Sequence, residues 1–131
     1  MKLINREVDY AARALVFMAR ANKPTVPVAQ MQETVGAAGP FLRKIMQKLH
    51  RAGVLQAVKG KGGGFALARA PENIRLSDLI SALQGPLRLN DCVVRRKLCR
   101  DHEACALRRR MEGIEARLLA EIATVTVKDL I

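Results

Sequence analysis

Apolar residues recur at helical spacing in the first half of the segment 40–67. Steps of three, four and three place them on one face of a predicted helix, and basic residues occupy the opposite face. Gly53 follows, where a left-handed backbone ends a helix at little cost. Two short apolar runs, 54–58 and 65–67, are joined by the basic sequence KGKGGG, which predicts a β-hairpin. The predicted buried positions of the helix are Leu42, Ile45, Leu49 and Ala52.

The same periodicity predicts further helices over 6–21, 28–35, 77–84 and 107–122. Asn5 and Ser77 are the expected caps of the first and third of these. The inward stripe of the first helix is expected to be Val8, Ala11, Ala12, Leu15 and Ala19. A helix, a short glycine-bearing turn and a basic helix form the helix-turn-helix pattern, and the hairpin makes it a winged helix. The predicted fold is therefore mainly α, with a small β-hairpin wing.

A regular apolar series runs along the last predicted helix. Its members, at spacings of four, three, four and four, are Leu107, Met111, Ile114, Leu118 and Ile122. This coiled-coil-like seam predicts a long dimerisation helix, and the alternative is a helix packed back onto its own core. We expect a winged helix-turn-helix DNA-binding domain over 1–84 and a cysteine loop over 85–106. Residues 107–131 are expected to form the dimerisation helix and a C-terminal turn.

Positive charge dominates the chain and gathers around the predicted basic helix and wing. There are 23 Lys and Arg residues against 12 Asp and Glu, and the segment 34–71 holds seven bases and no acid. A helix whose charged residues are all basic, beside a basic wing, favours a surface that binds the phosphates of a nucleic acid. The alternative is a cationic surface without this role. Only four residues are aromatic, which argues against base stacking on single strands and favours duplex DNA.

Three cysteines, an odd number, lie between the last two long helices, at Cys92, Cys99 and Cys105. The N-terminus lacks a signal-peptide core, and no apolar run is long enough to cross a membrane, so we expect a cytoplasmic protein. In that compartment the cysteines are better interpreted as metal ligands or reactive thiols than as disulfides.

The spacing of the cysteines is not the paired spacing of a structural zinc ribbon. The nearby cations, which favour the thiolate form of cysteine, are Arg95, Arg96, Lys97 and Arg100. An iron–sulfur cluster, a zinc ion and plain reactive thiols all remain open from the residues alone. A fourth ligand would come from His102, Glu103 or a group elsewhere in a dimer.

Several motifs together resemble one family. They are the opening Met-Lys-Leu, Asp9-Tyr10-Ala11, Leu49-x-x-Ala52-Gly53-Val54-Leu55, and the wing Lys59-Gly-Lys-Gly-Gly-Gly-Phe-Ala-Leu, with three loop cysteines about 25 residues later. The chain is similar through nearly its whole length to the Rrf-two family of bacterial transcription regulators, whose best-known members are IscR, NsrR and RirA.

The resemblance implies a homodimer that binds operator DNA and carries an iron–sulfur cluster on the three cysteines. Such a cluster senses iron supply, nitric oxide or redox state. IscR-like proteins place a histidine ligand where this chain has Arg108, and NsrR-like proteins take an aspartate from the partner subunit where this chain has Asp9. This favours a 4Fe–4S site completed by Asp9, with a 2Fe–2S site as the alternative. Asp9 could instead pair with Arg13, four residues on.

The resemblance places base-reading positions at Ala38, Pro40, Arg43 and Lys44. The exposed face of the predicted helix adds Gln47, Lys48 and Arg51, and the wing adds Lys59 and Lys61. Arg43 stands where IscR has an acidic residue, so a different operator is expected. The rival function is a DNA-binding regulator of the same fold without a cluster, which switches by cysteine oxidation or zinc. An enzyme is not expected, because His50 and His102 have no catalytic constellation around them.

Overall fold

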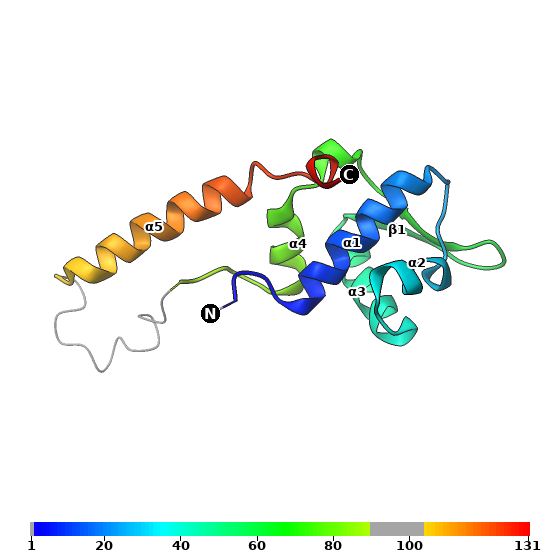
Figure 1. Cartoon of the computed structure of the whole chain (residues 1–131), viewed down its shortest axis with the longest axis horizontal. Coiled ribbons are helices and arrows are strands. Elements are labelled where there is room, and N and C mark those ends of the chain that lie inside the picture. Colours follow the sequence, from blue (N-terminus) through cyan, green and yellow to red (C-terminus); the bar gives the residue numbers. More distant parts are fainter. Residues whose placement is uncertain (1, 90–103) are drawn as a thin grey trace.

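The computed structural model describes residues 2–89 and 104–131, and in this part of the chain the fold is mainly helical with one two-stranded sheet (Figure 1). In chain order the elements are α1 (Arg6–Ala21), α2 (Val28–Val35), α3 (Gly39–Arg51), β1 (Leu55–Val58), β2 (Gly64–Leu67), the 3-10 turn η1 (Pro71–Asn73), α4 (Leu76–Leu83), α5 (Ala106–Ile122) and the 3-10 turn η2 (Val127–Leu130). The predicted winged helix-turn-helix with a long C-terminal helix is confirmed.

Helix α1 forms the centre of the core and contacts α2, α3 and α4. It begins where the sequence predicts, because the Asn5 side chain accepts a hydrogen bond of 2.9 Å from the Val8 amide. Of the predicted inward stripe, three members are fully buried and two are half-buried. Ala14 and Met18 are also buried, because α1 is covered on more than one side and its apolar face is wider than the predicted stripe.

Helix α3 buries Leu42, Ile45 and Leu49 completely, as predicted, together with Met46. The expected burial of Ala52 is wrong, because Ala52 is exposed. The helix ends at Arg51, and Ala52 is the residue that caps it. The left-handed turn expected after the helix is present at Gly53, whose φ is 78°.

The hairpin is antiparallel, with Leu55 opposite Leu67 and Val58 opposite Gly64. The segment before α2 pairs with it, since Val26 and Phe65 exchange two backbone hydrogen bonds of 2.8 and 3.0 Å. Gly64 permits this close approach, because a Cβ there would lie 2.4 Å from the Val26 oxygen. The wing is thus joined to the helix-turn-helix by main-chain bonds.

The start of α4 differs from the prediction that Ser77 caps it. The cap residue is Arg75, whose amide donates to the Asp78 carboxylate at 2.9 Å, so Ser77 lies in the first turn. Contacts with the end of the chain fix this start: the Leu76 amide donates to the Val125 carbonyl at 2.8 Å. The expected turn at the C-terminus is present as η2, which packs beside η1 and α1.

Helix α5 extends away from the body formed by the other elements, and the hairpin tip projects from the opposite side (Figure 1). Its C-terminal end packs on the core through Ile122, which is buried, and Leu118, which is half-buried. Its N-terminal part keeps apolar residues in solvent, with Leu107 67% and Ile114 43% exposed. None of the helices described in the structure is long and apolar enough to span a membrane.

Candidate nucleic-acid interface

A groove of about 640 Å³ lies between α3 and the wing. Its floor and sides come from the start of α2, one side of α3 and both strands of the hairpin. The polar and charged side chains that line it are Arg43, Gln47, His50, Arg51 and Lys59. The groove therefore brings together bases that are distant in sequence, on the helix and on the hairpin.

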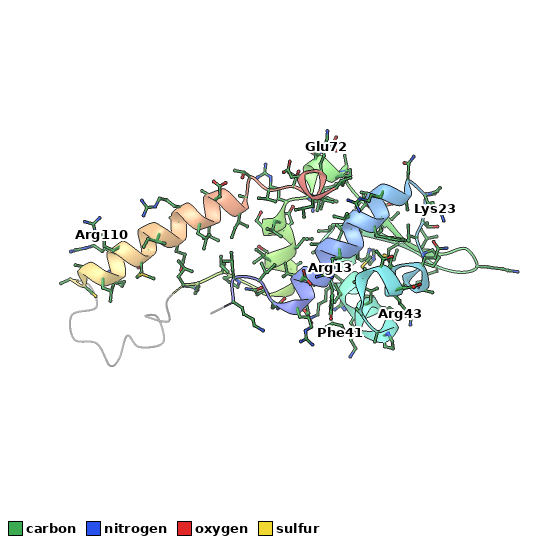
Figure 2. The ribbon with its side chains drawn as sticks, viewed as in Figure 1. Arg13, Lys23, Phe41, Arg43, Glu72 and Arg110 are labelled. Atoms are coloured by element: carbon green, nitrogen blue, oxygen red, sulfur yellow. The ribbon has the colours of Figure 1, made fainter. Side chains whose placement is uncertain are left out.

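The exposed face of α3 divides into two rows. Arg43, Gln47 and Arg51 line the groove, and their spacing of four places them along one side of the helix. Lys44 and Lys48 form the neighbouring row, outside the groove. Arg43 is marked on α3 in Figure 2, on the body of the molecule and far from Arg110 on α5. At the helix start, the predicted positions Ala38 and Pro40 are both exposed.

The wing tip carries Lys59 and Lys61, which are both exposed. Glycines turn the chain here, and the Gly63 amide donates to the Gly60 carbonyl at 3.0 Å. The Thr25 hydroxyl donates to the Gly62 carbonyl at 3.0 Å, which attaches the tip to the turn before α2. The two lysines are therefore presented from a hairpin that is bonded to the segment before α2 at Phe65 and at Gly62.

His50 connects the end of α3 to the first strand of the wing. Its Nδ1 lies 3.0 Å from the Leu55 carbonyl oxygen. A carbonyl oxygen only accepts, so Nδ1 is the protonated nitrogen and donates this hydrogen bond. No sequence signal indicates this role, because the partner is a backbone atom that any residue could supply.

One of the expected DNA-binding residues has an acidic partner. The Lys48 ammonium lies 3.0 and 2.9 Å from the two carboxylate oxygens of Glu7, at the start of α1. Among the described residues, Arg43, Lys44 and Arg51 form no salt bridge. The count of charges within 34–71 missed Glu7 because it lies well outside that segment and meets α3 only in the fold.

Of the expected cluster ligands, Cys92 and Cys99 lie outside the described residues, as do His102 and Glu103. Cys105 is half-buried and caps α5, and its Sγ accepts a hydrogen bond of 3.4 Å from the Arg108 amide. This sulfur therefore lies at the N-terminus of α5 and faces a backbone amide. Within the described ranges, no three metal-binding side chains are gathered together.

Asp9, the expected fourth ligand, lies in the first turn of α1 and forms a salt bridge of 3.1 Å with Arg13. Its side chain is 42% exposed, so the carboxylate is accessible from solvent. Asp9 lies in the first turn of α1 and Cys105 caps α5, and the starts of these two helices lie well apart in Figure 1.

Comparison with known proteins identifies the family. A family model described as Rrf2, Iron-dependent Transcriptional regulator, matches residues 4–131. The chain belongs to the Rrf2 family. This confirms the resemblance to the Rrf-two regulators, and membership makes the chain a DNA-binding transcriptional regulator with a winged helix.

Individual Rrf2 relatives agree with this assignment. The chain is 28% identical to an rrf2-like HTH-type transcriptional regulator of Rhodobacter capsulatus, over 98% of this chain and 92% of that protein. Among solved structures, T. potens IscR is similar with a TM-score of 0.71 and 23% identity, over 99% of this chain and 85% of that one. CymR, the global cysteine regulator of B. subtilis, has a TM-score of 0.68 and 20% identity, over 99% and 96%. At these identities the two structures show a shared fold.

Proposed function

We propose that this Rrf2-family protein acts as a homodimer that binds operator DNA through α3 and the wing and senses iron supply, nitric oxide or redox state through an iron–sulfur cluster. The observation that carries the DNA-binding part is the groove in which Arg43, Gln47 and Arg51 face Lys59 across a gap between helix and hairpin. A regulator of this kind works where the chromosome lies, and we place it in the cytoplasm.

In the proposed complex, α3 enters the major groove of duplex DNA. Arg43, near the helix start and exposed, reads a base, because a guanidinium can bind guanine O6 and N7 with two hydrogen bonds. Ala38, Pro40 and Lys44 take the other base-reading positions near the helix start, and Arg51 contacts a phosphate beside the groove. Lys59 and Lys61 project from the wing tip and supply affinity through the backbone or the minor groove.

The proposed dimer forms through residues 107–131. Leu107 and Ile114, two members of the apolar series on α5, are 67% and 43% exposed, and α5 extends away from the rest of the described structure in Figure 1. Pairing with a second copy would remove this apolar surface from water. Two recognition helices related by a twofold axis would then meet half-sites about 34 Å apart, or a multiple of that distance.

The proposed cluster is held by Cys92, Cys99 and Cys105, with a fourth bond from Asp9 of the partner subunit. The position of Cys105 at a helix N-terminus supports its role as a ligand. The starts of α1 and α5 lie well apart in Figure 1, and this separation favours an Asp9 ligand from the other chain over one from the same chain. A bound cluster supplies a centre that reacts with oxidants and nitric oxide. Asp9 would leave Arg13 to bind the cluster, and it would return to Arg13 when the bond to the cluster breaks. The bond between Asp9 and the cluster would therefore be reversible. We favour a 4Fe–4S cluster over a 2Fe–2S cluster because the position three residues after Cys105 is Arg108.

The test is anaerobic purification with iron and sulfide quantified, followed by three single variants. Asp9→Ala should change the visible spectrum of the reconstituted protein and its stability in air. The matched controls His102→Ala and Glu103→Ala should leave both close to those of the wild type. If His102→Ala bleaches the protein while Asp9→Ala has no effect, the fourth ligand is local and the proposal for Asp9 is wrong.

A second candidate is a regulator that switches by cysteine oxidation or zinc without a cluster. This candidate is supported by the similarity to CymR, which is described as a global cysteine regulator and shares the fold of this chain. A colourless anaerobic preparation with loss of free thiols on oxidation, or with bound zinc, would support this candidate. A coloured preparation with matching iron and sulfide would exclude it.

A further inference from the structure

The two rows on the exposed face of α3 differ in what lies beside them. Arg43, Gln47 and Arg51 face the groove, whereas the other side of the helix lies along α1. Phe41 and Lys48 are seven residues apart on α3, about two turns, and therefore share that side. Phe41 packs edge-to-face against Tyr10 of α1, with ring centroids 5.9 Å apart. Lys48 is thus on the side of α3 that contacts α1.

The ammonium of Lys48 is paired with one carboxylate, and the Lys48 side chain remains 41% exposed. Its ammonium lies within 3.0 Å of both Glu7 oxygens, and the Glu7 side chain is only 24% exposed. Glu7 and Tyr10 are three residues apart on α1, so both contacts with α3 come from one side of that helix. A phosphate approaching α3 would meet a neutral pair at Lys48, and at Lys44 and Arg51 it would meet cations that form no salt bridge with any residue that the structure describes.

We propose that Glu7 is a positioning residue for DNA recognition, which neutralises Lys48 and thereby removes it from the phosphate-contacting set of α3. This proposal rests on the proposed DNA-binding function, and it removes Lys48 from the residues of α3 that contact phosphate. The effect is on charge and not on stability, because partly exposed ion pairs contribute little to folding. With Lys48 paired, non-specific attraction is reduced, and a larger share of binding depends on Arg43 and Gln47 in the groove.

The experiment measures binding to a fluorescent mixed-sequence duplex of about 30 base pairs, about three helical turns, across a series of salt concentrations. The proteins are the wild type, Glu7→Gln, the double variant Glu7→Gln/Lys48→Met, and Arg51→Met as the matched control for loss of a free cation. The slope of log affinity against log salt changes by about 0.9 for each additional phosphate that the protein neutralises.

Glu7→Gln should make the slope steeper by about 0.9 per subunit, because Lys48 becomes free to bind a phosphate. The double variant should return to the wild-type slope, and Arg51→Met should flatten it by a similar amount. If Glu7→Gln leaves the slope unchanged and the double variant flattens it as Arg51→Met does, Lys48 contacts phosphate in the wild type and this proposal is overturned. A wild-type protein with no salt-dependent binding to duplex DNA would overturn the proposed function as well. Far-ultraviolet circular dichroism of each variant provides the check on folding.

Discussion

Replacing Gly64 by alanine should detach the wing from the helix-turn-helix. The Cβ would lie 2.4 Å from the Val26 oxygen, 2.6 Å from the Val26 carbonyl carbon and 2.7 Å from the Pro27 nitrogen. All three are backbone atoms, so no side-chain rotation can relieve the overlap. The two segments must separate, and the hydrogen bonds between Val26 and Phe65 are then lost.

The expected cost can be worked out from these contacts. Two backbone hydrogen bonds contribute about 1 kcal/mol each. Gly64 has a φ of 153°, a region that costs a residue with a Cβ about 1–3 kcal/mol. The sum is about 3–5 kcal/mol, a large part of the total of about 5–15 kcal/mol expected for a domain. The melting temperature should fall by about 10–20 °C for a chain of this length.

The matched control is Gly62→Ala in the same hairpin. Gly62 also has a positive φ, 78°, but a Cβ there would have no heavy atom within 4 Å from any described residue other than its neighbours in the chain. Its cost should be only the strain of a left-handed backbone, about 1–2 kcal/mol. Urea denaturation of both variants measures the difference, and the same samples tested on duplex DNA should show weaker binding for Gly64→Ala. Equal stability of the two variants would refute the claim that close contact with Val26 holds the wing.

Three further results are expected. Arg43→Ala should cost about 1–3 kcal/mol on a selected operator and relax preference at one base pair, whereas Lys59→Ala should weaken operator and random duplexes alike, as fluorescence anisotropy can measure. Leu49→Ala removes a fully buried side chain of α3 and should lower the free energy of unfolding by about 2–5 kcal/mol in urea titrations. The Thr126 amide and hydroxyl both donate to Asp129 and hold the pKa of its carboxyl below the ordinary value of 3.8. The unfolded chain therefore binds this proton first, so stability should fall as the pH drops below that value, and thermal denaturation of Asp129→Asn should show a smaller fall.

Local signals in the sequence were sufficient for most of the fold. Asn5 caps α1 with its own side chain, and Gly53 takes the left-handed turn after α3, so both helix ends are set by neighbouring residues. The stripe of α3 was found at Leu42, Ile45 and Leu49 because helical spacing determines which side chains share a face.

Features that depend on distant contacts were missed. Arg75 caps α4 because it forms a bridge with Thr126, near the end of the chain, and no pattern around Ser77 indicates this. The pairing of Glu7 with Lys48 also depends on the fold, because the two residues are 41 positions apart in the sequence. The groove itself is a product of the fold, since it forms where α3 and the wing come together.

The candidate cluster site rests more on the sequence than on the structure. The spacing of Cys92, Cys99 and Cys105 suggests a wrapped ligand set, and the family resemblance suggests Asp9. The structure adds the position of Cys105 at the start of α5 and the pairing of Asp9 with Arg13. A ligand supplied by a second chain cannot be deduced from spacing within one chain, because the distance between them depends on the dimer.

Our central claim is that the state of the cluster sets the affinity for DNA. The most direct measurement uses one anaerobic preparation and duplexes selected from a random pool by the coloured protein. Affinity is determined before and after removal of iron by a chelator, at one salt concentration. We predict affinities that differ by at least about fivefold, a coupling of about 1 kcal/mol. Equal affinities of the two forms on every selected duplex would contradict the claim.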